Sequence, residues 1–74
     1  MPTLDRIEVD PRICSGKPVL RGKRFAVHQI VDLVASGNTA KQIIADFPYL
    51  DEEDIHQALK YAAALARNEV SALP

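Results

Sequence analysis

The apolar residues of this chain follow two different periods, which divide it into a short front segment and a longer helical body. Residues 6–10 alternate polar and apolar side chains, the pattern of a half-buried β-strand, and Pro11 ends the alternation. Val19-Leu20 and Phe25 flank a tight turn in which Gly22 supplies an unusual backbone angle. The first 26 residues are therefore predicted to form short strands and turns. They hold too few apolar residues for an independent sheet, so they must pack on the helices or pair with another chain.

After residue 26 the apolar residues recur at i, i+3, i+4 and i+7, which is the spacing of an amphipathic helix. The first such set consists of Val27, Ile30, Val31 and Val34. It predicts a helix over residues 27–36, because Gly37 follows where a helix end favours a left-handed residue.

Capping residues predict two more helices. Thr39 and Gln42 have the spacing of a capping box, and Pro48 ends the short second helix. Asp51 is predicted to cap a third helix, whose acidic first turn lies near the positive end of the helix dipole. The apolar stripe of this helix consists of Ile55, Ala58, Leu59, Ala62, Leu65 and Ala66, and the helix is predicted to end at residue 68 or 69.

These elements predict a mainly α fold in a single domain over residues 1–74. Residues 1–26 form a strand-and-turn segment, called the arm below, and residues 27–69 form a trihelical body. Three helices with short turns outline a homeodomain-like or winged helix-turn-helix bundle. A core this small is marginal, and the single cysteine, Cys14, excludes a disulfide within one chain. We therefore expect a homodimer.

Composition argues against membranes, metals and catalysis. No apolar run approaches the roughly 18 residues of a membrane span, and the N-terminus lacks an apolar signal core. The single thiol fits a reducing compartment, so we expect a cytoplasmic protein. His28 and His56 lie far apart in sequence, which does not indicate a metal site. Cys14 beside Ile13 is more typical of a small buried hydrophobe than of a nucleophile, so we expect no enzyme, no catalytic residue and no cofactor.

The charge is distributed unevenly along the chain. Residues 1–24 carry a net charge of +3 and residues 25–74 carry −4, which together give the net −1. The basic residues of the arm after residue 11 are Arg12, Lys17, Arg21, Lys23 and Arg24. They can contact phosphates or an acidic protein surface, or they can form an ordinary solvated turn. In a third interpretation, Arg21 or Arg24 pairs with acidic groups of the chain's own helices and holds the arm in place.

The third helix is the natural recognition helix of such a bundle. His56, Gln57 and Lys60 are predicted on its exposed side, where they can read bases of operator DNA. The three carboxylates of Glu52, Glu53 and Asp54 oppose this interpretation, because they repel phosphates at the end that would enter the groove. In the alternative interpretation, these carboxylates simply cap the start of the helix and face solvent.

Tyr49 and Leu50 follow Pro48 in the turn before the third helix. They are predicted either to seal the turn against the core or to form an exposed anchor for a partner.

The same residues carry a family resemblance. Its first motif is Asp10-Pro11-Arg12-Ile13-Cys14 with Gly16-Lys17-Pro18-Val19-Leu20-Arg21-Gly22 and Arg24, and its later positions are Gly37, Ile43, Pro48, Tyr49-Leu50, Asp54-Ile55, Ala58-Leu59 and Tyr61-Ala62. Over about residues 4–65 the chain resembles the bacterial family called domain of unknown function 433, which commonly has Gly at the position of Ser15 and Thr at that of Lys23. The resemblance implies a helix-turn-helix protein grouped with VapB-type antitoxins. Such a protein binds a PIN-like ribonuclease toxin and can bind its own operator DNA. A protein-interaction module that docks on an acidic partner through the basic arm, without DNA binding, is the alternative.

Overall fold

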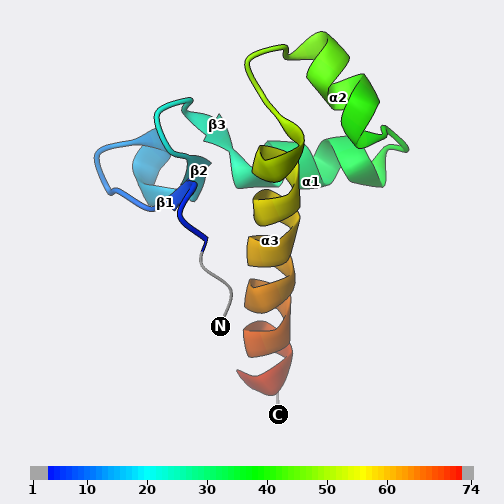
Figure 1. Cartoon of the computed structure of the whole chain (residues 1–74). Coiled ribbons are helices and arrows are strands. Elements are labelled where there is room, and N and C mark those ends of the chain that lie inside the picture. The colour runs from blue at the N-terminus through cyan, green and yellow to red at the C-terminus, as the bar shows by residue number, and fades with distance from the viewer. Residues whose placement is uncertain (1–3, 73–74) are drawn as a thin grey trace.

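The chain folds into three helices with a small sheet at the N-terminal end, as the computed structural model in Figure 1 shows. The structure describes the backbone of residues 4–72 and the side chains of residues 4–67. The elements in chain order are β1 (Ile7–Glu8), the 3-10 turn η1 (Cys14–Gly16), β2 (Val19–Leu20), β3 (Phe25–Ala26), α1 (Val27–Ala35), α2 (Ala40–Asp46) and α3 (Glu52–Ala72). The mainly helical architecture and the order of the elements are as the sequence predicted.

The three strands of the arm pair with one another in an antiparallel sheet of order β1-β2-β3. Ile7 lies opposite Leu20, and Leu20 lies opposite Phe25. Each strand is only two residues long, so the sheet gains its stability by packing on the helices. The sequence left open whether the arm packs on the helices or pairs with another chain. In this structure the arm packs on the chain's own helices. Figure 1 shows the sheet beside the first turns of α3, next to the start of α1.

The core lies where the sheet and the three helices meet. Its buried members are Ile7, Leu20, Phe25, Val27, Ile30, Ile43, Leu50, Ile55 and Ala58. Leu20 and Ile30 are fully buried, so β2 and α1 provide the centre of the core. The apolar pairs of the arm are thus part of the same core as the helices.

The predicted capping residues of the helices are confirmed. Gly37 has a left-handed φ of +98° after α1. At the start of α2, the Thr39 hydroxyl accepts from the Gln42 N–H at 3.2 Å, and the Gln42 side chain accepts from the Thr39 N–H at 2.7 Å. At the start of α3, the Asp51 carboxylate accepts from the Asp54 N–H at 2.9 Å, and Asp54 accepts from the Asp51 N–H at 3.0 Å.

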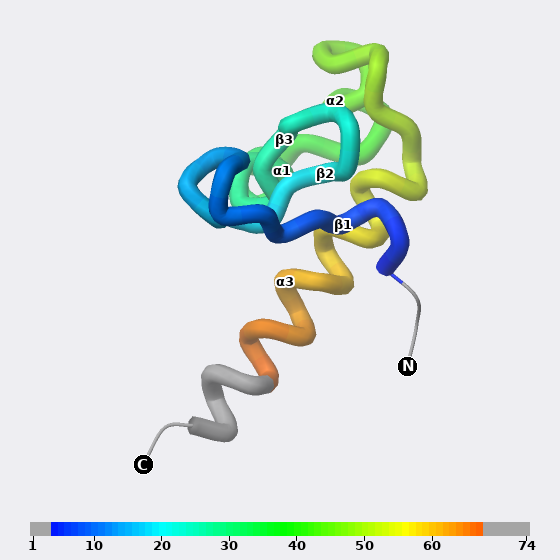
Figure 2. The backbone as a smooth tube through the Cα atoms, turned by 90° about the vertical axis from the view of Figure 1, so that its left-hand side faces the viewer, coloured from blue at the N-terminus to red at the C-terminus, as the bar shows by residue number. Residues whose placement is uncertain are grey.

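Helix α3 differs from the prediction in length and in burial. It continues to Ala72, about one turn past the predicted end. Its apolar stripe is buried only as far as Ala58, whereas Leu65 is 40% exposed and Ala66 is exposed. The second half of α3 leaves the body of the protein, as Figures 1 and 2 both show. Val34, predicted on the apolar face of the first helix, is 36% exposed near the end of α1.

Candidate functional site

A cluster of charged side chains joins the arm to the start of α3. Asp54 is only 2% exposed, and its carboxylate accepts hydrogen bonds from Arg6 Nη1 at 3.1 Å and from Lys23 Nζ. The same Arg6 nitrogen also donates to Asp51. Together with Gln57, which lies one turn further along α3, these residues are called the Asp54 cluster below. They connect positions 31 and 48 residues apart in sequence.

The ion pairs keep Asp54 charged although it is buried. Burial raises the pKa of Asp54, but hydrogen bonds from Lys23, from the Asp51 backbone and from Arg6 together outweigh it and leave the pKa below its ordinary value of 3.8. The Asp54 hydrogen bond also raises the pKa of Arg6. A buried carboxylate with two cationic partners therefore holds the arm in one position on the helices.

The prediction that Gln57 lies on the exposed side of the third helix is wrong. Gln57 is 4% exposed, and its side-chain oxygen accepts from the Arg6 backbone N–H at 2.9 Å. Its amide nitrogen donates to Asp5 and to Glu53, each at 2.9 Å. The hydrogen bond from Gln57 is the largest cause that lowers the pKa of Asp5. Strand β1 packs on the side of α3 that carries Gln57. This side is therefore buried, although the helical period predicted it as part of the exposed face.

Lys23, predicted among the DNA- or partner-binding residues of the arm, has its ammonium paired with buried Asp54. One of the three interpretations offered for the arm had Arg21 or Arg24 hold it in place, whereas the residues that do so are Arg6 and Lys23 on Asp54. A signal for Asp54 was present in the sequence. Asp54 stands four residues before Ala58 and so shares its core-facing side of the helix.

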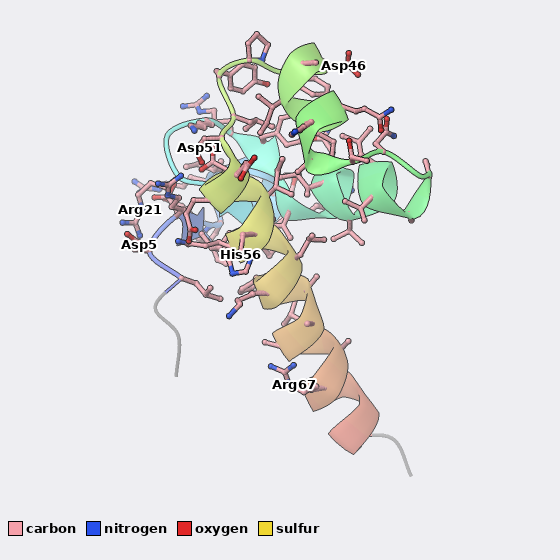
Figure 3. All side chains as sticks on the ribbon, turned by 45° about the vertical axis from the view of Figure 1, so that its right-hand side comes forward. Asp5, Arg21, Asp46, Asp51, His56 and Arg67 are labelled. Carbon is pink, nitrogen blue, oxygen red and sulfur yellow. The ribbon has the colours of Figure 1, made fainter. Side chains whose placement is uncertain are left out.

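Folding offsets much of the charge asymmetry seen in the sequence. A recess of about 340 Å³ is lined by three arm residues of positive charge, Arg6, Arg21 and Lys23, and by the carboxylates of Asp5, Asp51 and Asp54. Figure 3 shows Arg21 next to Asp5, on the side of α3 where Asp51 begins the helix. The positive charge of Arg21 contributes to the lowered pKa of Asp5. The basic arm is therefore less cationic in space than along the chain.

The other basic residues of the arm are exposed. Arg12 forms a two-point contact with the Asp10 carboxylate, from Nε at 3.1 Å and Nη2 at 3.0 Å, which lowers the pKa of Asp10. Lys17, Arg21 and Arg24 are exposed and make no ion pair with the side chains of residues 4–67. The cations that stay available to a partner are thus Lys17 near η1 and the two arginines of the β2–β3 turn.

An exposed aromatic ring lies close to the β2–β3 turn. Tyr49 is 55% exposed, and its ring packs edge-on against Phe25 and Phe47 with centroid distances of 6.4 Å to each. Phe25 directly follows Arg24 in the chain. Leu50 is 3% exposed, so it seals the turn, whereas Tyr49 has the exposure that an anchor needs. Arg21, Arg24 and Tyr49 are called the turn surface below.

The predicted DNA-reading side of α3 is only partly formed. His56 and Lys60 are exposed and lie one turn apart on this helix. His56 lines an open groove of about 660 Å³ between α2 and α3, together with Lys41, Glu52 and Glu53. The groove thus carries carboxylates beside its basic residues, which weakens the attraction for a phosphate backbone.

Cys14 is exposed, which corrects the expectation that it is a buried hydrophobe. It lies in η1 with a φ of +49°, followed by Ser15 at +58° and Gly16 at +83°. Cys14 is thus the first of three left-handed residues in succession, and its thiol is in solvent. In the part of the chain that the structure describes, no group of three or more His, Cys, Asp and Glu side chains could hold a metal ion.

Comparison with known proteins gives one family and two relatives. Residues 7–62 match the family model described as "Protein of unknown function (DUF433)". Over 54 residues the chain is 39% identical to "Uncharacterized protein y4eO" of Sinorhizobium fredii (strain NBRC 101917 / NGR234), a match that covers 73% of this chain and 24% of that protein. The crystal structure of a DUF433 member protein from Anabaena variabilis ATCC 29413 superposes with a TM-score of 0.79 at 26% identity. That match covers 86% of this chain and 63% of the other, so the chain spans about a quarter of the curated relative and less than two thirds of the solved one. Within residues 4–72, no helix has the length and apolar character needed to cross a membrane.

Proposed function

The chain belongs to the family "Protein of unknown function (DUF433)", and we propose that it is an antitoxin-like protein-interaction module that binds an acidic surface of a PIN-like ribonuclease toxin through its turn surface. The proposal includes a homeodomain-like or winged helix-turn-helix body of the VapB-type antitoxin class, acting in the cytoplasm as a homodimer. Its chemistry is arginine-to-carboxylate recognition by Arg21 and Arg24, with Tyr49 as an apolar anchor.

The observation that carries the proposal is the exposure of two arginines in the β2–β3 turn beside Tyr49, whose ring packs on Phe25. Arginine and tyrosine are enriched among the residues that dominate binding energy at protein interfaces. The guanidinium group forms paired hydrogen bonds with carboxylates, so an acidic surface is its natural partner. Because the Asp54 cluster and the core position the turn in advance, little backbone entropy is lost when the turn binds.

Operator DNA is the second candidate ligand. It is supported by the exposed His56 and Lys60 on α3, and it is opposed by burial of Gln57 and by the carboxylates around the helix start. A protein that neutralises phosphates loses affinity steeply as salt rises. Gel retardation of the chain's own promoter at low salt, lost in Lys60→Glu, would support this second function, and no retardation would exclude it.

The test of the first function uses the product of the neighbouring gene. The wild-type chain is expected to co-purify with that product and to relieve the growth arrest that its expression causes. Arg21→Glu with Arg24→Glu should lose both effects, whereas Lys60→Glu, a charge reversal on α3 outside the turn surface, should keep them. Unchanged co-purification of the double arginine variant would refute recognition by the turn surface.

A further inference from the structure

An apolar groove lies on another part of the molecule, between α1 and the second half of α3. It has a volume of about 620 Å³, and Lys17 and Pro18 are among the residues that line it. Val31 of α1 lines it on one side, and Tyr61, Ala62 and Leu65 of α3 line it on the other. Figure 2 shows α3 running away from the body on the side where the η1 loop lies. None of the turn-surface residues takes part in it.

The α3 wall of this groove is a short uncharged stretch. Residues 62–66 read Ala-Ala-Ala-Leu-Ala, between Lys60 and Arg67, and an apolar helix side of this kind is typical of packing against other protein. Leu65 is nevertheless 40% exposed. The small alanine side chains allow another helix to approach closely. A projecting helical segment of this length is also marginally stable by itself, which favours a partner that covers it.

The charges at the groove indicate what that partner is. Lys17 lines the groove and is exposed, and Asp32, whose side chain is 79% exposed, lines the α1 side. His28 Nδ1 lies 3.6 Å from the Asp32 carboxylate. The groove therefore carries one lysine and one aspartate of opposite sign around an apolar floor. A partner whose charges are all of one sign would be attracted by one of these residues and repelled by the other. A two-fold interface, in contrast, requires a surface that is complementary to itself.

We infer that two copies of this chain pair through the α1–α3 groove about a two-fold axis. The second halves of the two α3 helices pack against each other, and Leu65 of each copy enters the groove of the other. Lys17 of one copy faces Asp32 of the second copy, and this contact occurs twice. The inference rests on the homodimer proposed above but not on toxin binding, because the turn surface stays exposed in the pair.

Sedimentation equilibrium of the full chain between about 1 and 500 µM tests the pairing. The wild type is expected to be a dimer, and Leu65→Asp should raise the dimer dissociation constant at least about 100-fold, because each interface then buries two carboxylates where two leucines packed. Val9→Asp is the matched control, since Val9 is 56% exposed and lies outside the groove. A wild-type monomer at every concentration would overturn the inference, as would equal dimerisation of Leu65→Asp and Val9→Asp.

The two charged residues give a second test that does not depend on the apolar substitution. Lys17→Glu and Asp32→Lys should each weaken their own homodimer through two like-charge contacts. When the two variants are mixed, every facing pair has opposite sign, so a heterodimer should form as tightly as the wild-type dimer, within about threefold. Both side chains are exposed, so the fold should be kept, which circular dichroism checks. Failure of the mixture to form a heterodimer would overturn the facing of Lys17 and Asp32.

Discussion

Replacement of Asp54 by asparagine tests the Asp54 cluster most sharply. Asparagine keeps the shape of the side chain and one acceptor oxygen, but it removes the charge that Lys23 and Arg6 contact. A hydrogen bond to a charged group contributes about 1.5–3 kcal/mol and a neutral one about 0.5–1.5 kcal/mol, so two weakened bonds to Asp54 lower the free energy of unfolding by about 2–3 kcal/mol. Breaking a fully buried pair costs about 3–5 kcal/mol, and the smaller value is expected here because both cations reach solvent.

The effect should depend on pH in a defined direction. Because the folded-state pKa of Asp54 lies below 3.8, the stabilisation is complete above that value and is lost as pH falls through the folded-state pKa. Urea unfolding followed by circular dichroism should therefore show the full difference between wild type and Asp54→Asn near neutral pH and almost none at strongly acidic pH. Glu52→Gln removes an exposed carboxylate from the same helical turn and should change stability by less than about 0.5 kcal/mol. A difference for Asp54→Asn below about 0.5 kcal/mol, or one that stays constant into acid, would refute the reasoning.

Three further predictions concern the turns of the arm. Gly22→Ala should lower the free energy of unfolding by about 1 kcal/mol in urea titrations. Residue 22 has a φ of +76°, which strains any side chain, and the added Cβ meets no atom within 4 Å whose contact could offset that strain; an unchanged midpoint would contradict this. Ser15→Gly should raise it by about 0.5 kcal/mol, because relief of a left-handed φ of +58° exceeds the entropy cost of glycine, and a destabilised variant would show otherwise. Cys14 should be fully alkylated by iodoacetamide in the native protein, and mass spectrometry that finds modification only in denaturant would contradict its exposure.

The sequence predicted the local elements because their signals are local. The Thr39–Gln42 capping box, the left-handed Gly37 and the turn at Gly22 are each decided by residues within a few positions of one another. The alternating residues of β1 and the apolar pairs of β2 and β3 were sufficient to place the strands within one or two residues.

The candidate site was predictable only in part, because it depends on contacts across the chain. Gln57 was placed on the exposed side of its helix by helical period alone, yet β1 covers that side and its amide bonds to Asp5, 52 residues away. Lys23 was placed among the partner-binding residues because of the net positive charge of its segment, and its contact with Asp54 comes only from the folded chain. Which arm cations are consumed by acids of α3 is a property of the packed sheet and cannot be read from net charge along the chain. Tyr49 and Leu50, which the sequence left open, take one role each because only Leu50 reaches the core.

The central claim is that the turn surface binds an acidic protein partner. Its most direct measurement is the affinity of the purified chain for the purified product of the neighbouring gene, by isothermal titration calorimetry. Reversal of Arg21 and Arg24 to glutamate is predicted to raise Kd at least about 100-fold, since it replaces two attractive contacts by two repulsive ones, while Lys60→Glu leaves Kd within about threefold. Equal affinities of the wild type and the double arginine variant would contradict the account.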